Sequence, residues 1–86
     1  MRLSDSEIKI VELVMEIQPN LGLYEFVAES QIVNGTILDS FETMLLIDAI
    51  EAQYGVVVSI DALLVPANQT LEGLSALIDR TKHARL

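Results

Sequence analysis

Between residues 37 and 55, hydrophobic and polar positions follow one another with the spacing of a helix. Hydrophobic side chains recur three and four residues apart from Ser40 onward, and Gly55 follows the last of them as a typical helix stop. We therefore expect a helix that begins at Ser40 and ends before Gly55. A helical projection gathers the residues expected to face the core in one arc, and these are Thr43, Leu46, Ile47, Ile50 and Tyr54.

A second face of the same helix mixes hydrophobic and acidic side chains. It carries Phe41, Met44 and Leu45 together with Asp48 and Glu51, close to the expected start of the helix. A helix that buries one face has no internal use for this second surface, which suits the docking of a partner. The alternative is that these hydrophobic residues pack beneath the long segment that precedes the helix, and the residues alone leave both interpretations open.

Another helix is predicted between residues 4 and 17. Ser4 and Glu7 have the spacing of a capping box, and hydrophobic residues then recur at helical spacing until Pro19 ends the pattern. A connection of about twenty residues follows, and it is too hydrophobic to lie free in solvent. We expect it to cross the other helices, with a turn or two of helix at 24–29 and a single turn at 34–35.

Two further helices, preceded by a β-branched run, are predicted in the C-terminal third of the chain. Residues 56–60 are mostly β-branched and have strand propensity, but the sequence offers no second strong strand to pair with them. Asp61 is the expected cap of a short helix that runs through Leu64. Thr70 begins the last helix, in which Gly73 allows a neighbouring segment to approach closely.

Length and composition set the class of protein. The 86 residues allow one domain, residues 1–86, with one modest core. The chain contains no Cys, its first residues turn acidic before any hydrophobic run, and no hydrophobic stretch approaches a membrane span. We expect a cytoplasmic monomer with an all-α fold, an antiparallel four-helix bundle of three longer helices and one short helix, with a long first loop.

Charge narrows the set of partners. Thirteen acidic and five basic residues give a formal net charge of −8, and no Lys or Arg occurs between Lys9 and Arg80. Because phosphate-binding surfaces need cationic donors, this pattern argues against nucleic acid and anionic membranes as partners. It favours basic protein surfaces. The short basic tail at 80–86 is interpreted as a solvated helix end, where positive charge favours the helix dipole.

The sequence lacks the groups that an enzyme would need. A Ser nucleophile requires a base, usually His, and the single histidine is His83 in the C-terminal tail. The carboxylates have no calcium-loop spacing, and His83 has no companion ligand, so we expect no metal site. These observations predict that the chain is not an enzyme.

The residues around Ser40 resemble a known family. The phosphopantetheine attachment region of acyl and peptidyl carrier proteins is similar to the run from Leu38 to Phe41 and to Ile47, Ile50-Glu51 and Tyr54-Gly55. The similarity extends downstream to residues 60–64 and 70–74, and more loosely upstream to the first helix. An Asp-Ser-hydrophobic triplet alone is a weak signal, whereas the spacing to Tyr54-Gly55 and to the later helices is specific.

This resemblance implies that residues 56–60 form an extended connection whose side chains close one end of the core. It also implies a function for each matching position. Ser40 would carry a covalent 4'-phosphopantetheine arm, with Asp39 as its recognition partner, and the docking residues would be Phe41, Glu42, Met44, Leu45, Asp48 and Glu51. The implied partners are a phosphopantetheinyl transferase and the enzymes that load, condense or tailor an acyl or aminoacyl cargo.

The pathway is less closely defined. Asp39 and residues 34–35, which lead into the helix, resemble the same positions in discrete carriers of small-molecule or aminoacyl pathways, such as polyketide or nonribosomal peptide synthesis. Leu45 stands where carriers of fatty acid synthesis usually have an acidic docking residue, and Asp48 stands where they often have a hydrophobic one. The alternatives are the housekeeping carrier of fatty acid synthesis and an unmodified acidic helical adaptor.

Overall fold

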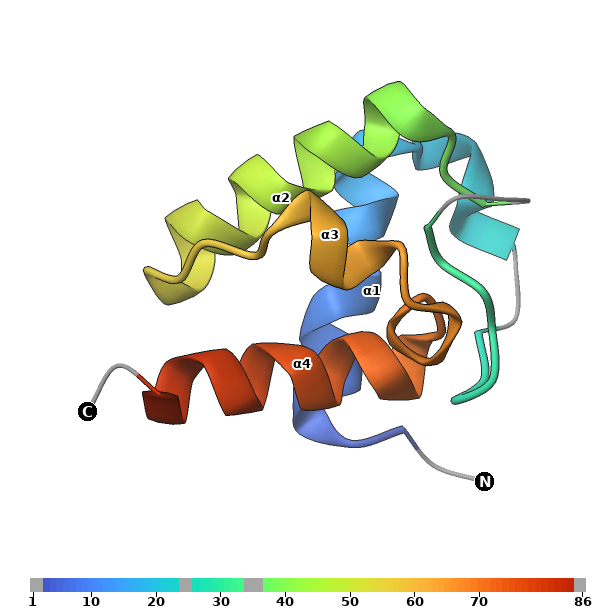
Figure 1. Cartoon of the computed structure of the whole chain (residues 1–86). Coiled ribbons are helices and arrows are strands. Elements are labelled where there is room, and N and C mark those ends of the chain that lie inside the picture. Colours follow the sequence, from blue (N-terminus) through green and yellow to red (C-terminus); the bar gives the residue numbers. More distant parts are fainter. Residues whose placement is uncertain (1–2, 24–25, 34–36, 85–86) are drawn as a thin grey trace.

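The computed structural model describes residues 3–23, 26–33 and 37–84, and this part of the chain is all-α, as predicted (Figure 1). Within these ranges the only β pairing is an isolated antiparallel bridge between Gln31 and Thr70. No helix in them has the length and hydrophobicity needed to cross a membrane. The elements in chain order are α1 (Asp5–Ile17), the 3-10 helix η1 (Pro19–Leu23), α2 (Ser40–Tyr54), α3 (Ile60–Leu63), the 3-10 helix η2 (Pro66–Asn68) and α4 (Leu71–Ala84).

Three longer helices and the short α3 surround the core. Figure 1 shows α2 and α4 running in the same direction across the molecule, with α3 between them and α1 crossing behind. Helix α1 packs against both α2 and α4. The expectation of an antiparallel bundle is therefore wrong for the pair α2 and α4, because the segment that contains α3 and η2 carries the chain back between them.

The beginning of α1 has the predicted capping box. The backbone N–H of Glu7 donates to Ser4 Oγ at 3.1 Å, and the N–H of Ser4 donates to Glu7 Oε1 at 2.8 Å. These reciprocal bonds satisfy two donors that the first turn of a helix leaves unpaired. The helix ends at Ile17, and Ile10 and Val14 are fully buried on its inner face.

The local helix in the long connection lies earlier than predicted. The sequence suggested a turn or two at 24–29, but residues 26–29 contain only a turn, and residues 24 and 25 lie outside the described ranges. The 3-10 helix η1 begins at Pro19 instead. Proline suits the first position of a helical turn, because its φ is already helical and its missing N–H is not needed there.

The second half of the connection is clamped to the start of α4. Backbone N–H groups of Leu71 and Glu72 donate to the carbonyls of Ser30 and Ala28, both at 2.8 Å, and the N–H of Ile32 donates to Gln69 O at 2.7 Å. The clamp supplies acceptors to the unpaired donors at the N-terminus of α4. The connection thus crosses the helices as predicted, and its buried hydrophobic residues are Ala28, Ile32, Val33, Ile37 and Leu38. The turn predicted at 34–35 lies outside the described residues.

The segment between α2 and α3 confirms one prediction and corrects another. Val56 and Val58 are buried in the core, as expected, and they lie in a connection at 56–59 that has no regular secondary structure, whereas Ile60 already belongs to α3. The cap of α3, however, is Ser59, whose Oγ accepts from the backbone N–H of Ala62 at 3.1 Å. Ser59 has the extended backbone that a capping residue needs, whereas Asp61 already lies within the first turn of the helix.

Gly73 provides the close approach that its sequence position suggested. A Cβ on Gly73 would overlap the backbone carbonyl of Ala67 in η2, which cannot move as a side chain could. The N–H of Gly73 also donates to Thr70 Oγ1 at 3.0 Å, near the beginning of α4. The contact between η2 and α4 therefore depends on the absence of a side chain at this position.

We expect Gly73→Ala to destabilise the protein by about 1–3 kcal/mol, because the new methyl group forces η2 away from α4. The sign of this change in stability is informative, since Gly→Ala inside an unobstructed helix is stabilising by roughly 1 kcal/mol. Denaturant unfolding of Gly73→Ala, compared with Ala76→Gly at an exposed site of the same helix, measures both effects. A Gly73→Ala variant more stable than wild type would show that the close contact is absent.

Candidate attachment and docking site

The site begins at the N-terminus of α2, where Asp39 caps the helix. The backbone N–H of Glu42 donates to Asp39 Oδ1 at 2.8 Å, and Glu42 Oε1 accepts from the N–H of Asp39 at 3.1 Å. This is a second capping box, which the sequence interpretation did not anticipate. At the other end, Gly55 has a φ of 71° and closes the helix in the left-handed conformation, as predicted.

Ser40 is the first residue of α2 and is exposed to solvent. Two other serines at helix N-termini, Ser4 and Ser59, are N-caps whose hydroxyls accept from backbone N–H groups. At α2 the carboxylate of Asp39 has that role. The hydroxyl of Ser40 is thus not needed to close the helix and faces the surface.

Thr43 stabilises the first turn of α2. Its Oγ1 donates to the backbone carbonyl of Asp39 at 2.8 Å, and the side chain is buried. The backbone N–H of Thr43 donates to the same carbonyl at 2.9 Å. The two bonds hold the turn that presents Ser40, so its position is set by the local structure of α2.

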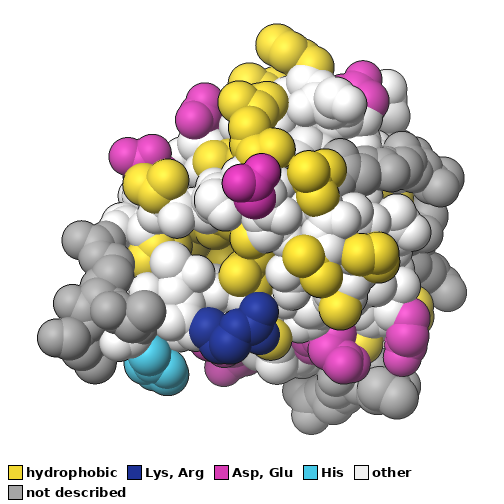
Figure 2. Space-filling model, in the orientation of Figure 1, with side chains coloured by type: hydrophobic (Ala, Val, Ile, Leu, Met, Phe, Trp, Pro, Cys, Tyr) yellow, Lys and Arg dark blue, Asp and Glu magenta, His cyan; other side chains and the backbone are white. Residues whose placement is uncertain are grey.

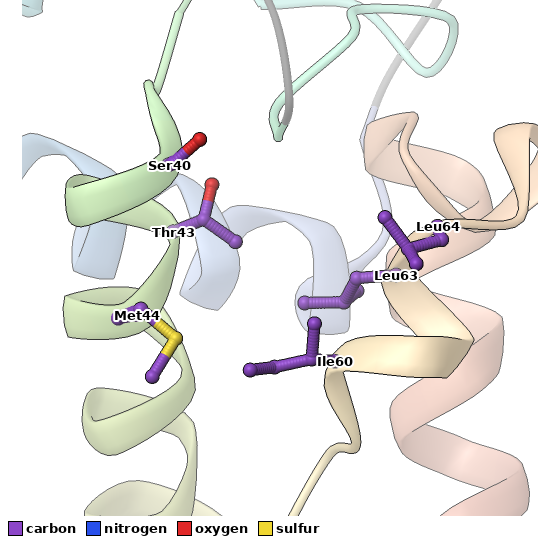
Figure 3. Close-up of a pocket in the computed structure, with 6 residues that line it drawn as sticks. All are labelled: Ser40, Thr43, Met44, Ile60, Leu63 and Leu64. Carbon is purple, nitrogen blue, oxygen red and sulfur yellow. The ribbon is translucent and has the colours of Figure 1, made fainter.

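A pocket of about 260 Å³ lies beside Ser40, between α2 and α3. Figure 3 shows Met44 of α2 and Ile60 of α3 pointing toward each other across this space. The hydroxyls of Ser40 and Thr43 lie at one end of it, and the remaining lining side chains are hydrophobic. The six lining residues are Ser40, Thr43, Met44, Ile60, Leu63 and Leu64.

The two faces of α2 are as predicted. Leu46 and Ile50 are completely buried, and Thr43 and Ile47 are nearly so. Tyr54 is half-buried at the far end, where Lys82 Nζ lies 5.1 Å from the centre of its ring. Burial raises the pKa of the Tyr54 hydroxyl, and the negative charges of Asp79 and Glu12 raise it further.

On the other face, Phe41, Met44 and Leu45 expose 71%, 46% and 39% of their surface. The interpretation that they pack beneath the preceding segment is therefore wrong. Asp48 and Glu51 are also exposed and continue the same stripe. The structure thus brings five of the six expected docking residues to one solvent-facing surface.

The sixth, Glu42, is placed differently. It is half-buried, and its carboxylate accepts from the backbone N–H of Asp39 in the capping box. The orientation of its carboxylate is set by this bond at the helix end. Asp39 is exposed and likewise acts in the cap, so both acids have a structural role beside any role in recognition.

Sequence interpretation missed three hydrophobic residues on and after α3. Ile60, Leu64 and Val65 expose 52%, 61% and 48% of their surface, and the first two line the pocket. The available signal was a surplus of hydrophobic side chains in a short helix. Only Leu63 of this segment is fully buried in the core, so the others had to face outward or toward α2.

Comparison of the chain with protein-family models, with curated proteins and with solved structures returned no match.

Proposed function

We propose that this chain is a discrete acyl or aminoacyl carrier protein that holds biosynthetic intermediates as thioesters on a 4'-phosphopantetheine arm at Ser40. In this proposal its three longer helices and one short helix form the four-helix bundle of that family. The protein works in the cytoplasm as a monomer, in a small-molecule pathway such as polyketide or nonribosomal peptide synthesis.

One observation carries the proposal, the exposed hydroxyl of Ser40 at the start of a helix that is already capped. Because Asp39 supplies the cap, Ser40 is free to be modified without loss of the helix end. The backbone N–H groups of Ser40 and Phe41 belong to the first turn, where a phosphate is favoured by about 0.3–1 kcal/mol at an exposed site. When attached, 4'-phosphopantetheine supplies a flexible thiol that holds the cargo.

The hydroxyl of Ser40 can act as a nucleophile only when a separate enzyme activates it. Figure 1 places the C-terminal end of α4, the helix that carries His83, at the opposite end of the molecule from the start of α2. Within the chain, no other histidine is available as a base. A separate transferase that binds coenzyme A is thus the source of both the base and the arm.

The pocket beside Ser40 favours an acyl cargo over an aminoacyl one. Its lining offers hydrophobic side chains and two hydroxyls, of which that of Thr43 is already donated to Asp39 O. An ammonium group would find no counter-ion among the lining residues, and burying an unpaired charge is costly. An uncharged aliphatic group meets no such penalty.

Incubation of the protein with coenzyme A and a promiscuous phosphopantetheinyl transferase tests the proposal. We expect intact-protein mass spectrometry to show the addition of one phosphopantetheine group. A protein that stays unmodified while a known carrier in the same tube is converted would contradict the proposal.

Binding of the same transferase tests whether the acidic residues on the exposed face of α2 steer a partner. We expect Asp48→Asn with Glu51→Gln to slow association and flatten its salt dependence, because exposed charges act at long range and are screened within about 8 Å at physiological salt. Leu45→Ala, which removes a contact and no charge, should mainly speed dissociation. Stopped-flow binding at two salt concentrations separates these effects, and salt-independent association of the wild type would contradict steering.

The second candidate is an unmodified acidic adaptor that binds partners through the same face of α2. The exposed hydrophobic residues Phe41, Met44 and Leu45 favour it as much as they favour a carrier. The two functions differ at Ser40, which is modified in the carrier and unmodified in the adaptor.

A further inference from the structure

The short helix α3 is held only loosely by hydrophobic packing. Of its four residues only Leu63 is fully buried, and Ile60 exposes 52% of its surface. Figure 2 shows hydrophobic side chains at the surface over α2 and α3, where close packing of the two helices would have buried them. The pocket of about 260 Å³ lies between the two helices instead. Packing against α2 therefore does not fix the position of α3.

Two side-chain amides hold α3 by its C-terminal carbonyls. Asn68 Nδ2 donates to the carbonyl of Ala62 at 2.8 Å, and Gln69 Nε2 donates to the carbonyl of Leu63 at 2.9 Å. Carbonyls in the last turn of a helix have no partner within the helix, so these amides supply donors that α3 itself lacks. Both distances are those of well-formed hydrogen bonds. We name Asn68 and Gln69 the amide latch.

The other end of each amide is bonded to a different part of the fold. Gln69 Oε1 accepts from Gln31 Nε2 of the long connection at 3.2 Å, and Asn68 Oδ1 accepts from Arg80 Nη2 of α4 at 3.4 Å. These two bonds are longer and exposed to solvent, so they are weaker than the bonds to α3. They turn the NH₂ group of each amide toward α3. Gln31 and Arg80 thus orient the amide latch.

The segment that carries the amide latch is itself firmly held. The carbonyl of Gln69 accepts from the backbone N–H of Ile32 at 2.7 Å. Ala67 of η2 approaches Gly73 of α4 so closely that a Cβ would not fit between them. The backbone at η2 is therefore fixed to the long connection and to α4, and the two amide side chains are the link from this fixed segment to α3.

We propose that the amide latch sets the shape of the pocket beside Ser40 and couples it to the long connection. Leu63, whose carbonyl Gln69 holds, is also one of the residues that line the pocket. While both amide bonds are made, α3 keeps the pocket closed around a hydrophobic group attached at residue 40. When they break, α3 moves relative to α2 and the pocket opens to water. This inference concerns the fold and does not rest on the proposed function.

A fluorescent label at residue 40 tests the link between the amide latch and the pocket. The chain has no Cys, so Ser40→Cys provides one attachment point for a thiol-reactive naphthalene dye, and Asp39 still caps α2. We expect the dye to be partly shielded from acrylamide, an uncharged quencher that the acidic surface does not repel. Gln69→Leu should raise the quenching constant about threefold, and Gln31→Leu should raise it by less.

Amide hydrogen exchange of the unlabelled protein tests whether the effect is local. The N–H groups of Leu64 and Val65 donate to the carbonyls of Asp61 and Ala62, so their exchange reports the opening of α3. We expect Gln69→Leu to speed exchange in residues 60–65 about tenfold, because the loss of one ordinary hydrogen bond shifts a local equilibrium by roughly that factor. Exchange in the buried turns of α1 and α4 should stay within about twofold.

The matched control is Gln53→Leu, which replaces an exposed glutamine near the C-terminal end of α2 and should change neither measurement. Three results would overturn the proposal. The first is wild-type quenching and exchange in both Gln69→Leu and Asn68→Leu. The second is faster exchange throughout the protein, which would show that the amides stabilise the whole fold. The third is a dye as accessible in the folded protein as in urea, which would separate the amide latch from the pocket.

Discussion

Ser40→Ala is expected to abolish phosphopantetheine transfer while leaving the fold intact. The hydroxyl oxygen of Ser40 is the atom to which the arm would be joined, so its removal leaves no acceptor. The variant should fold normally, because the cap of α2 is the Asp39 carboxylate and Ser40 is exposed. The expected result is no added mass under conditions that convert the wild type completely, with an unchanged melting temperature.

Ser59→Ala is the matched control. Ser59 is also an exposed serine at a helix N-terminus, but its hydroxyl caps α3 by accepting from the N–H of Ala62. We expect Ser59→Ala to be modified like the wild type and to lose about 1 kcal/mol of stability with its cap. A mass increase that persists in Ser40→Ala would assign the attachment to another residue.

The second large effect concerns stability, and it separates the two faces of α2. Ile50→Ala and Leu46→Ala should each lower the free energy of unfolding by roughly 2–5 kcal/mol, because both side chains are completely buried and leave cavities. Met44→Ala and Leu45→Ala should cost much less, since these side chains are already partly in water.

Denaturant unfolding of the four variants under one set of conditions measures this contrast. Leu45→Ala is the control for Leu46→Ala, because the two positions are adjacent and differ in burial and not in residue type. Equal losses of stability at these neighbouring positions would show that α2 does not bury the face that contains Leu46.

The elements that local chemistry specifies were predicted well. Helix α2 follows from the spacing of its hydrophobic residues and from Gly55, and α1 follows from its capping box at Ser4 and Glu7. Both signals lie within a few residues of the structure they describe. The need for Gly73 was also visible, because a glycine inside a helical pattern indicates a close neighbour.

The features that depend on distant residues were not predicted. The clamp between residues 28–33 and 69–72 consists of backbone hydrogen bonds, and the pattern of side chains does not indicate which backbone groups pair. It helps to explain how residues 28–33 are held although residues 26–29 form only a turn. The pocket beside Ser40 requires α2 and α3 to be placed against each other, and a single sequence does not show the distance between them.

The direction of the helices illustrates the same limit. Periodicity indicated which face of each helix is buried, and Leu46, Ile50, Leu71 and Leu74 are indeed in the core. It did not indicate that α2 and α4 run in the same direction, because hydrophobic periodicity is the same in either orientation. Short connections favour antiparallel neighbours, and the segment containing α3 is long enough to avoid that constraint.

The central claim is that Ser40 carries a 4'-phosphopantetheine arm in the organism that makes this protein. Intact-protein mass spectrometry of the chain purified from its native host, followed by fragmentation around Ser40, tests it most directly. The carrier function predicts an added mass of one phosphopantetheine group, with or without an attached cargo, located on Ser40. A native protein whose mass equals that of its sequence, and which a transferase does not convert afterwards, would contradict it.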